Sequence, residues 1–143
     1  MKSVRQLLQA KGGDIYSIGP DERVYDALQL MADKDVGALM VVEAGRPVGI
    51  VSERDYARKV ILLGRASADT PVSQIMSAPV VTVGPDEAVR RCMRIMTDRR
   101  IRHLPVVDSS GAMVGVISIG DLVSAVIEEQ QETIEQLEKF IAG

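Results

Sequence analysis

The residues best suited to chemistry in this sequence are a serine and an aspartate that recur at the same spacing in each half of the chain. The pattern Gly-φ-φ-Ser-x-x-Asp, in which φ is an apolar residue, occurs at Gly49–Asp55 and again at Gly115–Asp121. The apolar residues predict a buried strand, and the aspartate predicts the start of a helix. A carboxylate accepts hydrogen bonds from hydroxyl groups, and the free N–H groups of a first helical turn attract an anion. These residue types could therefore hold a polar, anionic ligand.

The two patterns belong to a longer internal repeat. Ser17–Val42 aligns with Thr82–Val107 without a gap, and 10 of the 26 positions are identical. After one inserted residue, Gly45–Asp55 aligns with Gly111–Asp121 at 5 of 11 positions. The short lead-in segments that precede the repeats also agree, with VRQLL at residues 4–8 matching VSQIM at residues 72–76. The chain is therefore a duplication.

Each repeat has the pattern of a β-α-β-β-α unit, which predicts a mixed α/β (α+β) fold. Short strands are expected at Ile15–Ile18 and Val80–Val83, each followed by a helix that Gly-Pro-Asp-Glu begins, with the aspartate as the N-cap. Further strands are expected at Ala38–Val42, Val48–Ser52, Leu104–Val107 and Val114–Ser118, before helices that begin at Asp55 and Asp121. One such unit is small for a self-sufficient core, so we expect the two repeats to be related by a pseudo-twofold axis.

The predicted boundaries place repeat one, with its lead-in helix, at residues 1–66 and repeat two at residues 67–130. Residues 131–143 extend the last helix. Ile127, Ile134, Leu137 and Ile141 of this helix fall on one seam with seven-residue spacing, interrupted by Gln130. A lone helix does not keep such a seam in water. We therefore expect it to hold two copies of the chain together as a homodimer, and the alternative is that it folds back onto its own repeat.

Composition excludes several classes of function. The net charge of −3 gives no general attraction to nucleic acids or anionic membranes, and no apolar run approaches the length of a membrane span. The single cysteine excludes an internal disulfide bond and fits a reducing compartment, so we expect a cytoplasmic protein. Because Cys92 lies on the apolar stripe of its helix and His103 is the only histidine, we expect no metal site. No nucleophile–base arrangement or Walker loop is present, which argues against an enzyme.

Arg102-His103-Leu104-Pro105-Val106-Val107-Asp108, together with the two Gly-φ-φ-Ser-x-x-Asp patterns, closely resembles tandem cystathionine-β-synthase-type (CBS) repeats. The likeness covers nearly the whole chain and is greatest to small stand-alone bacterial proteins with a pair of CBS repeats. It implies a regulatory module that binds an adenine nucleotide (AMP, ADP, ATP or NAD(H)) between its repeats. It also implies that the module reports the ligand to a separate regulated protein and that the homodimer is a flat disc of four repeats.

The resemblance implies two ligand sites, each headed by one aspartate. In nucleotide-binding members this aspartate holds the ribose, and the serine lies near the sugar-phosphate. The resemblance places Arg102 and His103 at positions of basic phosphate contacts, with Lys11 approaching from the N-terminal segment. The Asp121 site is thus expected to comprise Asp121, Ser118, Val116, Gly120, Arg102, His103 and Lys11 with Tyr16, Val36 and Gly37 from repeat one.

The second expected site differs because repeat one has Gly37 and Ala38 where repeat two has Arg102 and His103. It depends for positive charge on Arg54, or on Arg58. It is expected to comprise Asp55, Ser52, Arg54 and Ile50 with Pro79, Val80, Val81 and Ile101 from around the second repeat.

Simpler interpretations stay open for these residues. Asp55 and Asp121 could act only as helix N-caps, and His103 could be a packing residue. The chain would then be a constitutive protein-interaction scaffold with degenerate nucleotide sites.

Overall fold

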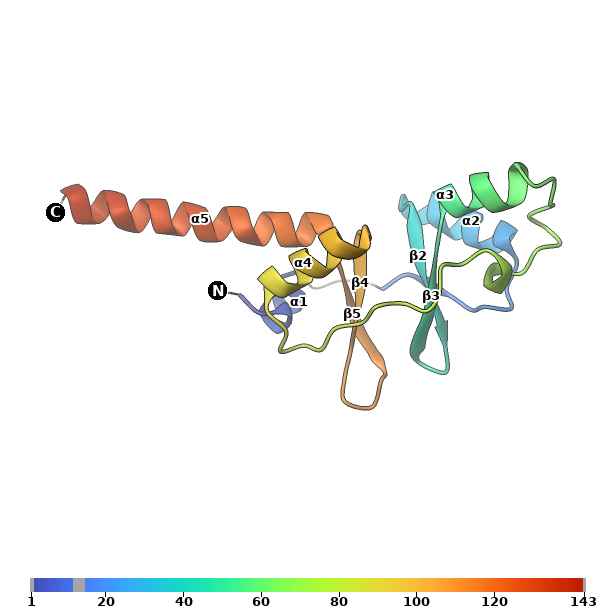
Figure 1. Ribbon diagram of the computed structural model, residues 1–143, viewed down its shortest axis with the longest axis horizontal. Coiled ribbons are helices and arrows are strands. Elements are labelled where there is room, and N and C mark those ends of the chain that lie inside the picture. The colour runs from blue at the N-terminus through green and yellow to red at the C-terminus, as the bar shows by residue number, and fades with distance from the viewer. Residues whose placement is uncertain (1, 12–14, 143) are drawn as a thin grey trace. The chain divides into compact units, whose positions relative to one another are not determined.

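The computed structural model describes residues 2–11 and 15–142 and divides them into two compact units. The repeat-one unit comprises residues 15–81 and 110–113, and the repeat-two unit comprises residues 2–11, 82–109 and 114–142. Both units combine small sheets with helices, so the predicted α/β fold class is confirmed (Figure 1).

The repeat-one unit is built on a three-stranded sheet in the order β1-β2-β3. β1 (Ser17–Ile18) pairs parallel to β2 (Ala38–Glu43), which pairs antiparallel to β3 (Arg46–Ser52). Helix α2 (Val24–Lys34) connects β1 to β2 and buries Val24, Ala27 and Met31. The short helix α3 (Glu53–Tyr56) follows β3 and continues as a π-helical turn at Ala57–Ile61. A 3₁₀ turn at Val72–Gln74 comes later in the chain and belongs to the same unit.

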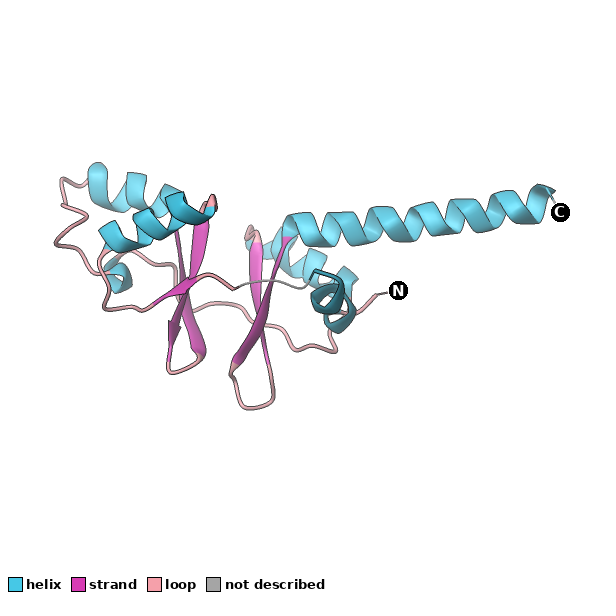
Figure 2. Cartoon of the chain, turned by 180° about the vertical axis from the view of Figure 1, so that it is seen from behind, coloured by secondary structure: helices cyan, strands magenta, loops and turns pink. Residues whose placement is uncertain are grey.

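The repeat-two unit follows the same plan. Strands β4 (His103–Val107) and β5 (Met113–Ser118) form a two-stranded sheet, and α4 (Val89–Arg99) buries Val89, Cys92 and Met96. The long helix α5 (Ile119–Ala142) follows β5 and contacts α4 and the N-terminal helix α1 (Val4–Lys11). Figure 2 shows these elements from the other side, with α5 continuing beyond α4. The predicted continuation of this helix to about Ile141 is confirmed.

The predicted first strands are too long. Of the first strand predicted in repeat one, only Ser17–Ile18 forms a strand. At the first strand predicted in repeat two, the structure has a single parallel bridge between Val83 and Val106. Both predicted strands keep the end that precedes Gly-Pro and lose their upstream residues, Ile15–Tyr16 and Val80–Thr82, which are in no strand or bridge.

The helices after Gly-Pro-Asp-Glu also begin later than predicted, at Val24 and Val89. Instead of capping the helix, this segment forms a turn: the Glu22 N–H donates to the Gly19 carbonyl, and the Gly19 N–H donates to the Glu22 carboxylate at 2.7 Å. The predicted N-cap role of Asp21 and Asp86 is therefore wrong. The residues at the cap positions are Arg23 and Ala88, and neither makes a side-chain cap hydrogen bond.

Each lead-in segment packs in the unit of the other repeat. The segment before repeat one joins the repeat-two unit, where the N–H groups of Val4 and Arg5 donate to the carbonyls of Glu87 and Pro85. The segment before repeat two joins the repeat-one unit, where Val72 and Ser73 donate to Glu22 and Pro20 in the same way. The compact units therefore differ from the linear boundary predicted at residue 66, because each repeat completes its core with a lead-in segment that is distant in the sequence.

Two glycines allow this close packing. A Cβ atom on Gly115 would collide with the Leu8 side chain, and one on Gly49 would collide with Met76. Leu8 and Met76 occupy equivalent positions in the two lead-in segments. The first glycine of each Gly-φ-φ-Ser-x-x-Asp pattern thus lets a lead-in segment lie directly against the strand that carries the pattern.

Candidate functional site at the strand–helix junctions

The junction of β5 with α5 brings Ser118 and Asp121 into reciprocal hydrogen bonds. The Ser118 N–H donates to Asp121 Oδ2 at 2.8 Å, and the Asp121 N–H donates to Ser118 Oγ at 3.2 Å. This is the geometry of a capping box, in which a serine and an acidic residue three positions later satisfy each other's backbone N–H groups. α5 therefore begins at Ile119, two residues before the predicted start, and Asp121 lies inside its first turn.

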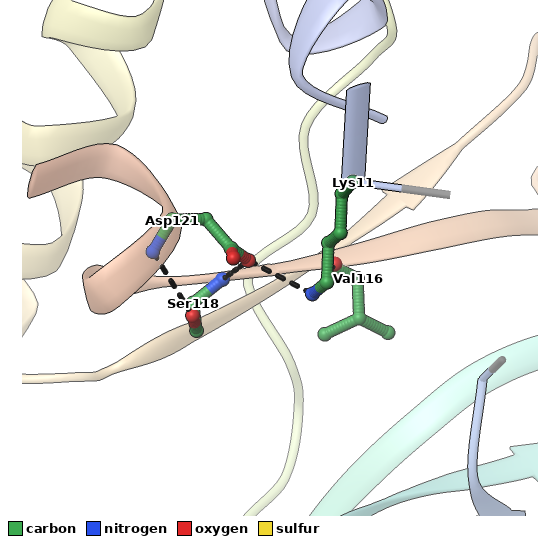
Figure 3. A network of polar contacts seen from close by, with 4 residues as sticks. All are labelled: Lys11, Val116, Ser118 and Asp121. Carbon is green, nitrogen blue, oxygen red and sulfur yellow. Dashed lines mark hydrogen bonds and ion pairs between the residues drawn. The ribbon is translucent and has the colours of Figure 1, made fainter. Parts of the chain in front are cut away.

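Lys11 approaches the same carboxylate from the end of α1. Its ammonium group lies 2.8 Å from Asp121 Oδ2 and donates to the Val116 carbonyl at 3.0 Å (Figure 3). The Asp121 side chain is 23% exposed, so this charged pair is accessible to a ligand. Both the Ser118 and the Lys11 contacts go to Oδ2. Within residues 2–11 and 15–142, no hydrogen bond to Oδ1 is found.

The Asp121 carboxyl is held ionised by its surroundings. Burial alone would raise its pKa, but the hydrogen bond and positive charge of Lys11 and the hydrogen bonds with Ser118 together lower the pKa below the ordinary value. The carboxylate is therefore an acceptor at neutral pH.

Arg102 and His103 lie next to the start of α5. The Ile119 N–H donates to the Arg102 carbonyl at 2.9 Å, which fixes the beginning of β4 beside the first turn of α5. The pKa of His103 is lowered, first by burial and then by the positive charges of Lys11 and Arg102, against the opposing effect of Asp121. Of the two residues predicted to contact phosphate, only the exposed Arg102 thus has a permanent charge, and His103 is neutral at neutral pH.

The junction of β3 with α3 repeats this arrangement around Asp55. Ser52 is the N-cap of α3, and its N–H and hydroxyl groups both lie 3.0 Å from Asp55 Oδ2, while the Asp55 N–H donates to Ser52 Oγ. Lys59 contacts Oδ1 at 3.3 Å and donates to the Ile75 carbonyl. Both oxygens of Asp55 therefore have partners, and its side chain is only 15% exposed.

Lys59 was missed in the sequence, although the spacing of four residues from Asp55 is typical of an ion pair on a helix. Repeat two has Ala125 at the equivalent position, and the cation there comes from α1. A contact between residues 11 and 121 has no such local signal in the sequence.

The two junctions differ at the residue whose carbonyl accepts from the first turn of the helix. Gly37 is the counterpart of Arg102, and the Glu53 N–H donates to its carbonyl at 3.1 Å. The Glu53 carboxylate lies 3.3 Å from the point where a Cβ atom on Gly37 would be. Val36, Gly37, Asp35 and Glu53 line a shallow pocket of about 260 Å³ with α2. The α5 junction thus has the exposed Arg102 where the α3 junction has Gly37, and the only nearby arginine in the first turn of α3, Arg54, is adjacent to Glu53.

The remaining predicted site residues lie in both units. Ile50 pairs with Ser77 through two backbone hydrogen bonds of 3.1 and 2.8 Å, which brings the segment before Pro79 alongside β3. Arg54 and Gly120 are exposed at equivalent positions in the first turns of α3 and α5. Tyr16, Val36, Pro79, Val80 and Val81 belong to the repeat-one unit, and Ile101 belongs to the repeat-two unit. A cleft formed by residues of both units stays a prediction.

Other chemistry finds little support. Among the described residues, no three His, Cys, Asp or Glu side chains are grouped so that they could hold a metal ion. Cys92 is buried on α4, as predicted from its stripe, and burial followed by the Glu87 charge raises the pKa of its thiol to about 11. Within the described part of the chain, no helix combines the length and hydropathy that a membrane span requires.

Comparison with known proteins agrees with the internal repeat. The family model of the CBS domain matches the chain twice, at residues 5–61 and 72–128. The mitochondrial CBS domain-containing protein CBSX3 of Arabidopsis thaliana is 46% identical over 128 residues, which are 86% of this chain. The chain spans only 62% of that relative's length.

Solved structures match over most of the chain. A protein with CBS domains from Burkholderia ambifaria MC40-6 is 49% identical with a TM-score of 0.82, and the match covers 90% of this chain and 96% of the other. The CBS domain protein PAE2072 from Pyrobaculum aerophilum, whose structure is a complex with AMP, is 29% identical with a TM-score of 0.72. That match covers 84% of this chain and 89% of the archaeal one.

Proposed function

The chain belongs to the CBS-domain family and carries two such domains in tandem, and from this premise we propose that it is a regulatory module that binds an adenine nucleotide at the Asp121 junction and catalyses no reaction. The observation that carries the proposal is the ionised Asp121 carboxylate at the start of α5. Lys11 and Ser118 orient it through Oδ2, so that Oδ1 can accept from the hydroxyl groups of a ribose.

The phosphate of the ligand would lie at the first turn of α5. The N–H groups of Ile119 and Asp121 already donate to Arg102 and Ser118, whereas none of the described residues accepts a hydrogen bond from the Gly120 N–H. A free N–H at a helix N-terminus attracts an anion, and the Arg102 side chain adds a positive charge beside it. His103 contributes an N–H donor without charge.

The proposed ligand class is AMP, ADP, ATP or NAD(H). The AMP complex of the archaeal relative supports an adenine nucleotide, and no metal is needed for the contacts proposed above. The Asp55 junction would bind more weakly, because Ser52 and Lys59 occupy both oxygens of Asp55.

The ligand state would pass to a separate regulated protein. The candidate signal-transduction role given to the Burkholderia ambifaria relative agrees with this output. A ligand shifts such an interaction only if it binds one state of the module more tightly than the other. The proposed place of action is the cytoplasm, where a single buried thiol such as Cys92 stays reduced.

Isothermal titration calorimetry with a nucleotide panel tests the proposal. The expected result is binding of at least one of AMP, ADP, ATP and NAD, with weaker binding of GMP. Absence of heat with every adenine nucleotide, on protein shown by mass spectrometry to hold no copurified nucleotide, would overturn it.

A second candidate function is a constitutive protein-interaction scaffold. It is favoured by the capping box at Ser52 and Asp55, which gives the repeated pattern a purely structural role in repeat one. Equilibrium dialysis separates the two functions, because a scaffold with degenerate sites retains no adenine nucleotide.

A further inference from the structure

The second half of α5 carries a row of apolar side chains on its exposed surface. The seam consists of Val123, Ile127, Gln130, Ile134, Leu137 and Ile141, with successive spacings of four, three, four, three and four residues. Its apolar members are between 42% exposed at Val123 and 82% exposed at Ile141. Both ribbon views show the C-terminal end of α5 extending beyond α1 and α4 (Figures 1 and 2), whereas Gln130 and Ile134 of the seam also line a groove with Arg90 and Met93 of α4. The alternation of four and three is the repeat of two helices that supercoil around each other.

The charges of this helix lie away from the seam. Glu128, Glu129, Glu132, Glu135 and Lys139 occupy the outer positions of the repeat. The positions that flank the seam are Ser124, Val126, Gln131, Thr133, Glu138 and Phe140, of which only Glu138 is charged. Flanking charges select the partner of a paired helix. Since these flanks carry almost none, an identical acidic helix can approach without opposing like charges.

Gln130 is the only polar residue of the seam. If two copies of α5 run parallel and in register, each Gln130 lies opposite the other, and an amide has both a donor and an acceptor to offer its equivalent. An antiparallel pair that aligns all six seam positions places Gln130 opposite Ile134, which leaves a buried amide without a partner at a cost in free energy. A single polar layer of this kind fixes orientation and register in paired helices.

We propose that the α5 seam binds the same seam of a second copy of this chain as a parallel, in-register pair of helices. In such a pair, Glu138 of the second copy flanks Thr133 of the first. Thr133 lines a groove between α5 and α4 together with Met93 and the exposed Arg90. In the proposed pair, the positive charge of Arg90 would therefore lie near Glu138 of the second copy, the one charged residue that flanks the seam. The proposal is independent of nucleotide binding, because the seam begins beyond the Asp121 junction.

Sedimentation of the full chain over a range of concentrations tests the seam. Leu137→Glu puts a carboxylate into the seam of both helices, and we expect it to raise the dissociation constant of the dimer by more than about tenfold. Gln136→Glu adds the same charge one residue away at an outer position and should leave the constant unchanged. Thermal melting of both variants verifies that the units stay folded. A monomeric wild-type chain would overturn the proposal, as would equal dimerisation of both variants.

Oxidative cross-linking tests the orientation. Gln130→Cys should form a disulfide-linked dimer, because a parallel register brings the two substituted residues together. The wild-type chain is the control, since its only thiol, Cys92, is fully buried and should not cross-link. A Gln130→Cys chain that dimerises in sedimentation but gives no cross-link would contradict the parallel register.

Discussion

At the scale of residues, the serine and aspartate of each repeat combine a structural task with a chemical one. The capping boxes hold the first turns of α3 and α5 in place, and the same bonds orient each carboxylate. What distinguishes the two aspartates is their other neighbours. Asp121 has one oxygen turned to Lys11 and Ser118 and lies near Arg102, whereas Asp55 has partners on both oxygens and lies in the same turn as Glu53.

Replacement of Arg102 separates phosphate recognition from recognition of the nucleoside. We expect Arg102→Ala to weaken AMP binding by about 1.5–3 kcal/mol, the value of a hydrogen bond to a charged group, and to leave adenosine binding nearly unchanged. Arg99→Ala, which removes an exposed arginine at the end of α4, is the matched control and should change neither. Calorimetry with both ligands measures the difference. Equal losses for AMP and adenosine would mean that Arg102 acts through the structure of the junction.

Protonation of His103 should couple stability to pH. Its pKa in the folded chain is lowered from 6.5, so the folded state disfavours the proton relative to the unfolded state. Above pH 6.5, the His103 side chain is neutral in both the folded and the unfolded chain, so it does not lower the free energy of unfolding there. The free energy of unfolding falls as pH drops from 6.5 through the lowered folded pKa, and then stops changing on this account. Denaturant unfolding of the wild type and His103→Asn should show this slope only in the wild type. A slope of the same size in both would assign it to other groups.

At the scale of elements, the sequence predicted the existence of most helices and strands and erred at their ends. The existence of α2, α4 and the strands β2 to β5 is confirmed, because apolar periodicity reports which face is buried. Asp21 and Asp86 were misplaced as caps, since a local turn closed by Glu22 competes with capping and has a similar sequence. The contact of Lys11 with Asp121 was beyond prediction from the residues themselves, because it depends on the exchange of lead-in segments.

The packing of α1 against β5 should be sensitive to one methyl group. Gly115→Ala places a Cβ atom 2.6 Å from Leu8, and we expect overpacking to cost about 1–3 kcal/mol of unfolding free energy. Gly84→Ala is the matched control, since no atom lies within 4 Å of its added Cβ. Thermal or urea unfolding of the two variants measures the cost. Equal stabilities would show that α1 does not hold this position against the strand.

At the scale of the whole molecule, a bound nucleotide should stabilise the folded chain. A ligand that binds only the folded state adds about 2.7 kcal/mol at one hundred times its dissociation constant. AMP, ADP, ATP or NAD should therefore raise the melting temperature of ligand-free protein, and GMP should raise it less. Unchanged melting in the presence of every adenine nucleotide would favour the scaffold function.

The measurement that tests the central claim most directly is calorimetric titration of AMP into the matched variants Asp121→Asn and Asp55→Asn. Each variant removes one charge from a capping box, so their effects on folding should be similar and differences in affinity report the ligand site. We expect Asp121→Asn to weaken AMP binding by roughly 1.5–3 kcal/mol through loss of the charge-assisted bond to the ribose, and Asp55→Asn to weaken it far less. Equal, negligible effects of the two substitutions would contradict the assignment of the nucleotide to the Asp121 junction.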